Sequence, residues 1–415
     1  SNYLWQDNVG RKEPMKPTMP GLFPLRNWAY GVIFCWCVST AYTVWAANLS
    51  LTNPNRPARD MRLFFIHQSV GQNWLQDDYG GLGVALRDNG YFVSDSNYGW
   101  GPDSIGDTTD IGSWYRWFRS AGSGNYLATL YSASDQNCPY SRLENPPSGP
   151  NQIVMFKSGF PNSALQGSLT DPIPAIASNP LREQDAGSEY HTLANAKGIY
   201  LDLLNYFATR PDKLFVAVTA PPLSDPTCAD KARAFNQWLV HDWLAAYPQT
   251  NVFVFDFYNV LTSNNRSPSS SDVNLATGNH HRWRNGTDEH KSDGGGNVSA
   301  YASSPDDDHP SEAGSQKATA EFVPLLNAAV NAWQASLQPP PTAPQFILAH
   351  LDESQIHLSF SELSPGFTYL LQRNTNSSQP QWTDVASLPA TAGATNWSEP
   401  FYPQAGCMFY RIKVN

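Results

Sequence analysis

The sequence predicts an α/β domain built on a parallel sheet with helices on both faces, followed by a small all-β sandwich. Two patterns indicate the first domain: short apolar runs, and apolar residues at helical spacing between these runs. A third pattern, alternating apolar and polar residues in short C-terminal segments, indicates the second domain. A hydrophobic content of 41% and a charged content of 15% over 415 residues suit a globular chain with a sizeable core.

Four nearly continuous apolar runs are typical of strands that are buried on both faces of a parallel sheet. They occupy residues 61–67, 152–158, 213–220 and 251–258. Between them, apolar side chains recur at helical spacing at Leu193, Ala196, Tyr200, Leu203 and Phe207, and again at Phe235, Leu239 and Trp243. Strands that alternate with helices form βαβ units, so residues 48–337 are expected to form the α/β domain. Its active site is expected at the carboxyl ends of the strands.

Two segments interrupt or follow this pattern. Residues 262–304 are rich in Ser, Asn, Gly and Asp, which indicates a long insertion loop. Residues 338–345, QPPPTAPQ, form a proline-rich linker. The segments in residues 346–415 are typical of a small β-sandwich, and they resemble a fibronectin type III-like module.

The N-terminal residues 1–47 are expected to be an extension with a signal peptide. Lys16 and Arg26 precede an uncharged run at residues 28–47 that closes in small residues, which is the layout of a secretory signal. Cleavage is expected near Ala46 or Ala47, and the protein is then secreted or displayed at the cell surface. An uncleaved membrane anchor is the alternative, because about 20 apolar residues can span a bilayer.

The net charge limits the classes of binding partner, and the cysteine content limits the possible disulfides and metal sites. With 26 basic and 36 acidic side chains the net charge is −10, and without residues 1–47 the counts are 22 and 34, a net charge of −12. This excess of negative charge argues against nucleic acid and anionic membranes as partners. In an exported chain Cys138 can pair with Cys228, which leaves Cys407 alone and no cysteine pair of the metal-binding type.

The stretch SPDDDHPSEAG, residues 304–314, has the residues of a catalytic base. Asp306 lies three positions before His309, so a turn can fold its carboxylate onto one imidazole nitrogen and leave the other nitrogen free for a nucleophile. Ser69 follows the first apolar run in FFIHQSVG, residues 64–71, where it would lie at the carboxyl edge of the sheet.

Asp306, His309, Pro310 and Gly314 resemble the last sequence block of the SGNH/GDSL hydrolases, and Ser69 matches that family's nucleophile by its position after the first strand. The resemblance covers about residues 61–335 and implies a flavodoxin-like fold and a Ser-His-Asp triad without a cofactor or metal. His67 and Gln68 replace the family's usual glycine and aspartate, and are possible neighbours of the site.

The resemblance also implies an oxyanion hole made of the serine N–H, a glycine N–H and an asparagine side chain. Asn162, which follows the apolar run at residues 152–158, is the candidate for the asparagine. Gly99 is the candidate for the glycine, with Gly101 and Gly106 as alternatives in the same stretch.

Three other groupings of residues could carry chemistry. Lys157 with Ser158 or Ser163 could form a Ser-Lys pair, although this would leave Asp306 and His309 without a role. The residues His280, His281, Asp288 and His290 could bind zinc, but a solvated insertion is favoured. The aspartates 306–308 could bind calcium, but one triad member with two solvated neighbours is favoured.

The sequence therefore predicts a secreted serine esterase that acts on an ester. The 14 tryptophans and the acidic character favour a carbohydrate-linked acyl group such as acetyl, with lipid or aryl esters as alternatives. Transfer of the acyl group to another sugar would use the same residues. The alternative from a different class is an inactive surface or matrix protein that binds glycans or assembles with itself.

Overall fold

The protein is described by a computed structural model, which defines residues 49–265, 267, 271–292, 296–338, 344–352, 354–364, 367–375, 381–389, 394–400 and 408–414. The chain divides into two compact units between residues 338 and 344. The predicted signal peptide and Cys407 lie outside the described residues.

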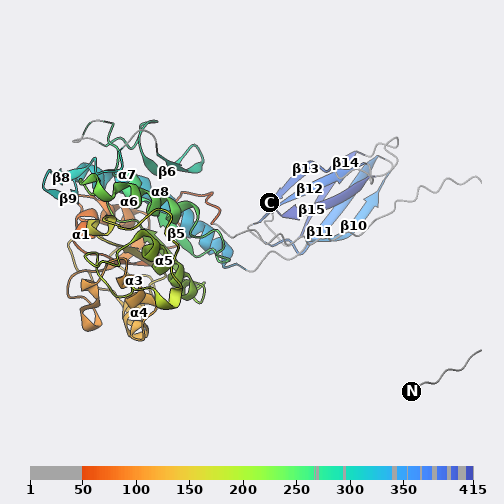
Figure 1. The fold of residues 1–415 in the computed structure, drawn as a ribbon. Helices are drawn as coiled ribbons and strands as arrows, with labels where there is room; N and C mark the ends of the chain where they lie inside the picture. The colour runs from red at the N-terminus through yellow and green to blue at the C-terminus, as the bar shows by residue number, and fades with distance from the viewer. Residues whose placement is uncertain are drawn as a thin grey trace, which may run out of the picture. The chain divides into compact units, whose positions relative to one another are not determined.

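A five-stranded parallel sheet forms the centre of the first unit (Figure 1). Its strands are β1 (Met61–Ile66), β2 (Tyr91–Ser96), β3 (Ile153–Lys157), β4 (Leu214–Val218) and β5 (Val252–Phe255). The strand order β2-β1-β3-β4-β5 is that of flavodoxin-like folds, which place ligands at the carboxyl ends of the strands. The prediction of a parallel α/β fold is confirmed.

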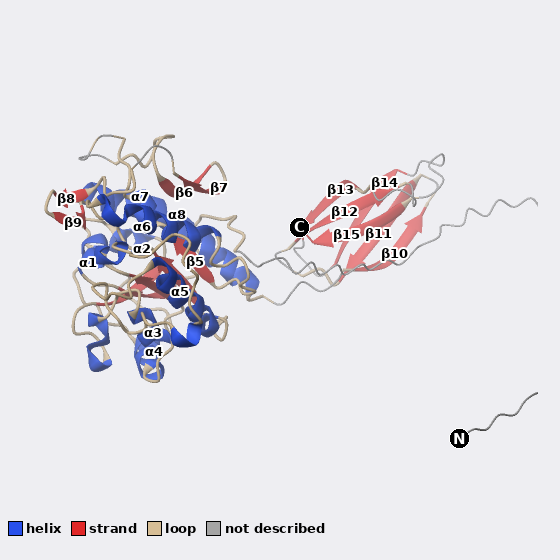
Figure 2. Cartoon of the chain, viewed as in Figure 1, coloured by secondary structure: helices blue, strands red, loops and turns tan. Residues whose placement is uncertain are grey.

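Helices cover both faces of this sheet (Figure 2). One face packs against α1 (Ser69–Leu75), α2 (Leu82–Asp88), α7 (Phe257–Val260) and α8 (Glu312–Ser336). The other face packs against α3 (Ser113–Phe118), α4 (Ser123–Ser132), α5 (Leu193–Phe207) and α6 (Ala229–His241). Short 3-10 turns lie at Pro102–Asp107, Phe160–Ser163, Ile176–Ser178 and Pro226–Cys228. Because every strand is covered on both sides, its side chains are buried throughout, which explains the continuous apolar runs in the sequence.

Two antiparallel hairpins are built beside this sheet. Strand β6 (His280–Arg284) pairs with β7 (Thr287–Lys291), and β8 (Ala302–Ser304) pairs with β9 (Asp307–Pro310). The described part of segment 262–304 is therefore not simply a long loop. Asn285 and Gly286 join β6 to β7 with positive φ angles of 52° and 80°, as a two-residue type I′ turn requires.

The second unit consists of two antiparallel three-stranded sheets. One contains β10 (Gln345–Leu351), β11 (Gln355–Ser361) and β14 (Ala394–Pro400), and the other contains β13 (Thr383–Pro389), β12 (Thr368–Asn374) and β15 (Phe409–Val414). Leu358 and Phe360 of the first sheet share a core with Tyr369 and Leu371 of the second. The predicted C-terminal β domain is confirmed.

The cysteine pairing proposed from the sequence is wrong. Cys138 and Cys228 are both buried and free. The Cys138 thiol lies 3.5 Å from Oδ2 of Asp95, whereas the sulfur of Cys228 accepts a hydrogen bond from Gln166. Among the residues that the structure describes, no helix is both long and apolar enough to cross a membrane.

Candidate active site

Ser69 is held at a sharp turn between the first strand and the first helix. Strand β1 ends at Ile66, and α1 begins at Ser69 after the connecting residues His67 and Gln68. A Cβ atom on Gly71 would lie only 2.3 Å from Cβ of His67, so the first turn of α1 can approach the strand end this closely only because residue 71 is glycine. The turn leaves Ser69 half-buried at the carboxyl edge of the sheet.

His309 reaches the same edge from strand β9. The Tyr79 hydroxyl donates a 2.8 Å hydrogen bond to the carbonyl of Pro310, which fixes the end of this strand. Directly afterwards Ser311 caps α8, since its hydroxyl accepts a hydrogen bond from the Gly314 N–H at 3.3 Å. His309 is thus presented from a short strand whose far end is anchored.

The structure brings Ser69, His309 and Asp307 into one hydrogen-bonded row. Nε2 of His309 lies 2.9 Å from Oγ of Ser69, and Nδ1 lies 2.5 Å from Oδ1 of Asp307. A carboxylate can only accept, so Nδ1 carries the imidazole proton and Nε2 is left to accept from the serine hydroxyl. This arrangement suits a general base that activates a serine.

The aspartate of this row is Asp307, so the prediction of Asp306 is wrong. Residues 307 and 309 both lie in strand β9, where side chains two positions apart leave on the same face. The prediction of Asp306 assumed a turn, in which three positions would be the correct spacing. Asp306 is exposed. Asp308 is partly exposed and accepts a 2.8 Å hydrogen bond from the backbone N–H of Ser224, which anchors the loop that follows β4.

Hydrogen bonds further stabilise the ionised form of Asp307, whose side chain is 46% exposed. The backbone N–H of His309 and then its ring lower the pKa of Asp307 to about 2, and the Ser303 hydroxyl contributes a further 2.9 Å bond. On its other side the His309 ring meets the ring of Phe160 edge-on, with the centroids 4.9 Å apart. His309 is therefore held from both sides while its side chain remains 25% exposed.

Two of the predicted oxyanion donors, Asn162 and Gly99, use their N–H groups elsewhere. The amide nitrogen of Asn162 donates to Oδ1 of Asp110 at 2.6 Å and to the carbonyl of Gly159 at 3.3 Å, which uses both of its hydrogens. The backbone N–H of Gly99 donates to Oδ1 of Asp107 at 2.7 Å. In this structure both residues donate hydrogen bonds that stabilise neighbouring loops.

Two donors lie near Ser69: its own backbone N–H, which the resemblance implies, and the side chain of Asn97, which was not singled out from the sequence. Within the described residues, the backbone N–H of Ser69 has no acceptor, as is usual for the first turn of a helix. Asn97 directly follows β2, and its amide donates a 2.9 Å bond to Gln72, which lies one turn after Ser69 on the same helix. Gln72 is the one described residue that accepts from this amide, so its second hydrogen is available.

The two predicted site neighbours, Gln68 and His67, do not join the row. Gln68 is the N-terminal flanking residue of α1, and its side chain donates to the carbonyl of Gly106 at 3.2 Å. His67 is fully buried, and its Nε2 lies 3.2 Å from Oδ2 of Asp95. His67, two residues before Ser69, is therefore part of the buried interior of the domain.

The alternative Ser-Lys pair is not assembled. The ammonium group of Lys157 donates to the carbonyl of Ser158 at 3.0 Å, and the Ser163 hydroxyl donates to the carbonyl of Pro221 at 2.7 Å. Burial lowers the pKa of Lys157 to about 7.

The histidine-rich segment is also not a solvated loop. His280 and His281 are buried. The ring of His280 lies 2.7 Å from Oε1 of Glu321, and Nδ1 of His281 accepts from the backbone N–H of Asp256 at 2.9 Å. These partners place His280 and His281 in the domain interior and leave His280 without a free ring nitrogen, since its Nε2 contacts the carbonyl of Thr277.

No family model, curated protein or solved structure matches the chain. The geometry of Ser69, His309 and Asp307 is therefore the ground on which an activity can be assigned.

Proposed function

We propose that the α/β domain is a serine esterase that resembles the SGNH/GDSL hydrolases and removes an acyl group, such as acetyl, from a carbohydrate. The observation that carries this proposal is the 2.9 Å separation of Ser69 Oγ and His309 Nε2, with Asp307 on the other ring nitrogen. The nucleophile and base come from segments 240 residues apart, yet they meet at the edge where such sheets place their ligands.

In this mechanism His309 Nε2 takes the proton of Ser69 as Oγ attacks the ester carbonyl carbon. The tetrahedral intermediate then collapses, and the leaving alcohol receives the proton from His309. Water attacks the acyl-serine and gives a proton to His309. Collapse of the second intermediate releases the acid and returns the proton to Ser69.

We assign the oxyanion contacts to the backbone N–H of Ser69 and to the side chain of Asn97. Among the described residues each of these groups has a hydrogen without an acceptor, whereas both hydrogens of the Asn162 amide are already used. Each well-aimed donor contributes about 3–4 kcal/mol of transition-state stabilisation.

A carbohydrate substrate is supported by the aromatic residue beside Asn97. Tyr98 is 62% exposed and follows Asn97 at the carboxyl edge of the sheet, where its ring can stack on a sugar. Tyr98→Ala is expected to raise KM for an acetylated oligosaccharide while leaving KM for a small aryl acetate unchanged. An equal effect on both substrates would argue against this role.

One observation favours the alternative of an inactive glycan-binding or self-assembling protein. Two of the three oxyanion donors that the family resemblance implies, Asn162 and Gly99, are engaged elsewhere. We further propose that the protein is secreted, on the ground of the predicted signal peptide, and that its C-terminal module is fibronectin type III-like.

A transferase that moves the acyl group to another sugar would use the same residues as the esterase. Analysis of the reaction products separates the two activities.

The first test is labelling of the protein with a fluorophosphonate probe, which reacts with activated serines. Labelling is expected for the wild type and is expected to be lost in Ser69→Ala and His309→Ala. Ser158→Ala is the matched control, because the buried Ser158 hydroxyl has no partner among the described residues and its loss should leave labelling intact. A folded wild-type protein that neither labels nor hydrolyses aryl acetates would favour the inactive alternative.

A further inference from the structure

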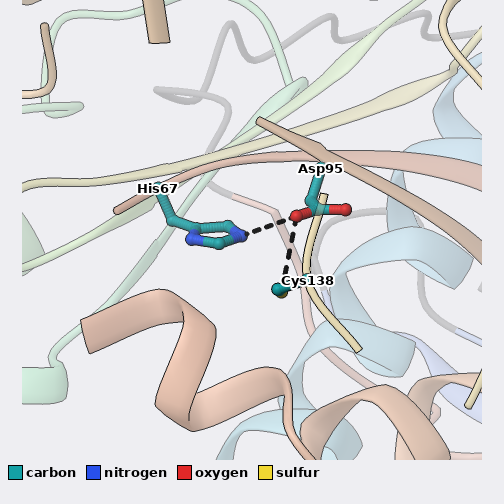
Figure 3. A group of neighbouring side chains, drawn as sticks. All are labelled: His67, Asp95 and Cys138. Carbon is teal, nitrogen blue, oxygen red and sulfur yellow. Dashed lines mark hydrogen bonds and ion pairs between the residues drawn. The ribbon is translucent and has the colours of Figure 1, made fainter. Parts of the chain in front are cut away.

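A buried group of three side chains lies beneath the turn that carries Ser69. His67 follows β1, Asp95 belongs to β2, and Cys138 comes from the loop between α4 and β3. All three are buried, and their possible ligand atoms lie within 4.8 Å of one another (Figure 3). They are separated by up to 71 positions in the sequence, so the fold alone brings them together.

Two of the three separations among these atoms match those of ligands around one tetrahedral ion. Nε2 of His67 and the sulfur of Cys138 lie 3.2 Å and 3.5 Å from the same atom, Oδ2 of Asp95. Zinc bonds of about 2.0 Å to nitrogen and oxygen and about 2.3 Å to sulfur imply separations of about 3.3 Å and 3.5 Å at tetrahedral angles. A direct N–H···O bond is typically shorter, at about 2.9 Å.

The tautomer of His67 points to a cation on the same side. Nδ1 of His67 lies 2.9 Å from the carbonyl oxygen of Gln68, which can only accept, so Nδ1 carries a proton. In a neutral ring, Nε2 then directs a lone pair at the carboxylate of Asp95, which is repulsive unless a cation lies between them. Histidines that bind metals usually donate their other N–H in this way to a carbonyl or carboxylate.

The two oxygens of Asp95 have separate partners. Oδ1 accepts 2.8 Å bonds from the hydroxyl of Tyr140 and the backbone N–H of Asn137, which orient the carboxylate. Oδ2 faces His67 and Cys138. One oxygen fixed by outer donors and one turned toward other ligands is the pattern of a metal-binding carboxylate.

We propose that His67 Nε2, Asp95 Oδ2 and Cys138 Sγ bind a zinc ion that fixes the turn before Ser69. Histidine, carboxylate and thiolate together are a ligand set suited to zinc. The doubly charged ion would balance one carboxylate and one thiolate, so the buried site would carry no net charge. Because His67 also donates a hydrogen bond to the Gln68 carbonyl, a bound ion would restrict the movement of the backbone next to Ser69. The proposal is independent of any activity of Ser69.

Binding of the ion would require the Cys138 thiol to lose its proton. Burial, followed by the neighbouring Asp95 carboxylate, raises the pKa of the Cys138 thiol, so the thiol is protonated before the ion binds. Coordination forms the Zn–S bond and releases that proton to solvent. The competing arrangement has no ion, and a doubly protonated His67 forms an ion pair with Asp95.

The test is the metal content of the whole chain, produced with added Zn²⁺ and freed of loosely bound ions by gel filtration. We expect about one zinc per chain in the wild type and in Cys228→Ser, which removes a buried cysteine elsewhere, and less than a tenth of this in Cys138→Ser. Wild-type protein without zinc would overturn the proposal, as would Cys138→Ser with undiminished zinc.

Replacement of zinc by Co²⁺ in the wild type gives a second readout, which remains informative if Cys138→Ser fails to fold. Thiolate ligation produces a sulfur-to-cobalt charge-transfer band, and we expect this band in the wild type and in Cys228→Ser. The absence of the band in folded wild-type protein with bound Co²⁺ would overturn the assignment of Cys138. Labelling by fluorophosphonate, measured in parallel, shows separately whether Ser69 is activated.

Discussion

Oδ1 of Asp307 lies 2.5 Å from Nδ1 of His309, two residues further along the same strand. The same oxygen accepts the backbone N–H of His309 at 3.0 Å, so one carboxylate fixes both the strand and the ring. Nε2 is consequently directed at Ser69, 2.9 Å away. Three aspartates occur in succession here, and the conformation of the strand determines which of them supports the base.

Exchange of Asp307 for Asn should therefore lower activity far more than exchange of Asp306. In Asp307→Asn the neutral amide no longer stabilises the imidazolium or its tautomer, and we expect a loss of about 10³–10⁴-fold in kcat/KM. Asp306→Asn is the matched control and should retain activity, because Asp306 is exposed. The measurement is hydrolysis of an aryl acetate by both variants. Equal losses would contradict the assignment.

The two asparagines should also differ in their effects. Loss of one oxyanion donor typically lowers kcat by about 10²–10³-fold, and we expect this for Asn97→Ala. Asn162→Ala removes bonds to Asp110 and Gly159, so it should lower the melting temperature while kcat of the remaining folded enzyme stays close to wild type. Steady-state kinetics and thermal unfolding of both variants check this. The reverse order in kcat would restore Asn162 as the donor.

The strands that could be predicted are those whose local sequence is a continuous apolar run. Strands β1, β3, β4 and β5 are buried on both faces and appear in the sequence as apolar runs. Strand β2 was not singled out because its second half, Ser94 to Ser96, is polar. The partners that make its burial possible include Tyr140, which is 45 positions away from Asp95 and invisible to local patterns.

The site was predictable in its residue types but not in its details. Ser69 and His309 could be identified because each follows a recognisable local pattern. The choice among three adjacent aspartates depends on whether residues 307–310 form a strand or a turn, and pairing with β8 decides this. Of the two proposed oxyanion donors, the Ser69 N–H was expected from the resemblance, whereas Asn97 was not singled out because asparagine occurs in many loops for other reasons.

Lys157 should make stability depend on pH above neutrality. Burial lowers its pKa from 10.5 to about 7, so between these values the unfolded chain binds a proton that the folded chain does not. The free energy of unfolding should therefore rise with pH across this window, and the penalty is fully present below pH 7. Lys157→Met is expected to stabilise the protein by about 2–4 kcal/mol at pH 6 and by less at pH 10.

Urea unfolding of Lys157→Met at the two pH values measures this effect. Lys231→Met, which replaces a partly exposed lysine of α6, is the control and should show no such difference between pH 6 and pH 10. Destabilisation by Lys157→Met that is equal at both pH values would show that the buried ammonium carries no penalty.

Gly71 should be essential for the position of Ser69, because a Cβ atom there would lie 2.3 Å from Cβ and 2.5 Å from Cγ of His67. The Cβ of His67 cannot move without its backbone, so Gly71→Ala must displace α1, and overpacking of this kind costs about 1–3 kcal/mol. We expect lower stability together with a large loss of kcat.

Gly124→Ala is the matched control, since nothing lies within 4 Å of its added Cβ in α4. That substitution should be neutral or stabilise the protein by up to about 1 kcal/mol. Wild-type stability and activity in Gly71→Ala would show that α1 does not pack against His67 in this way.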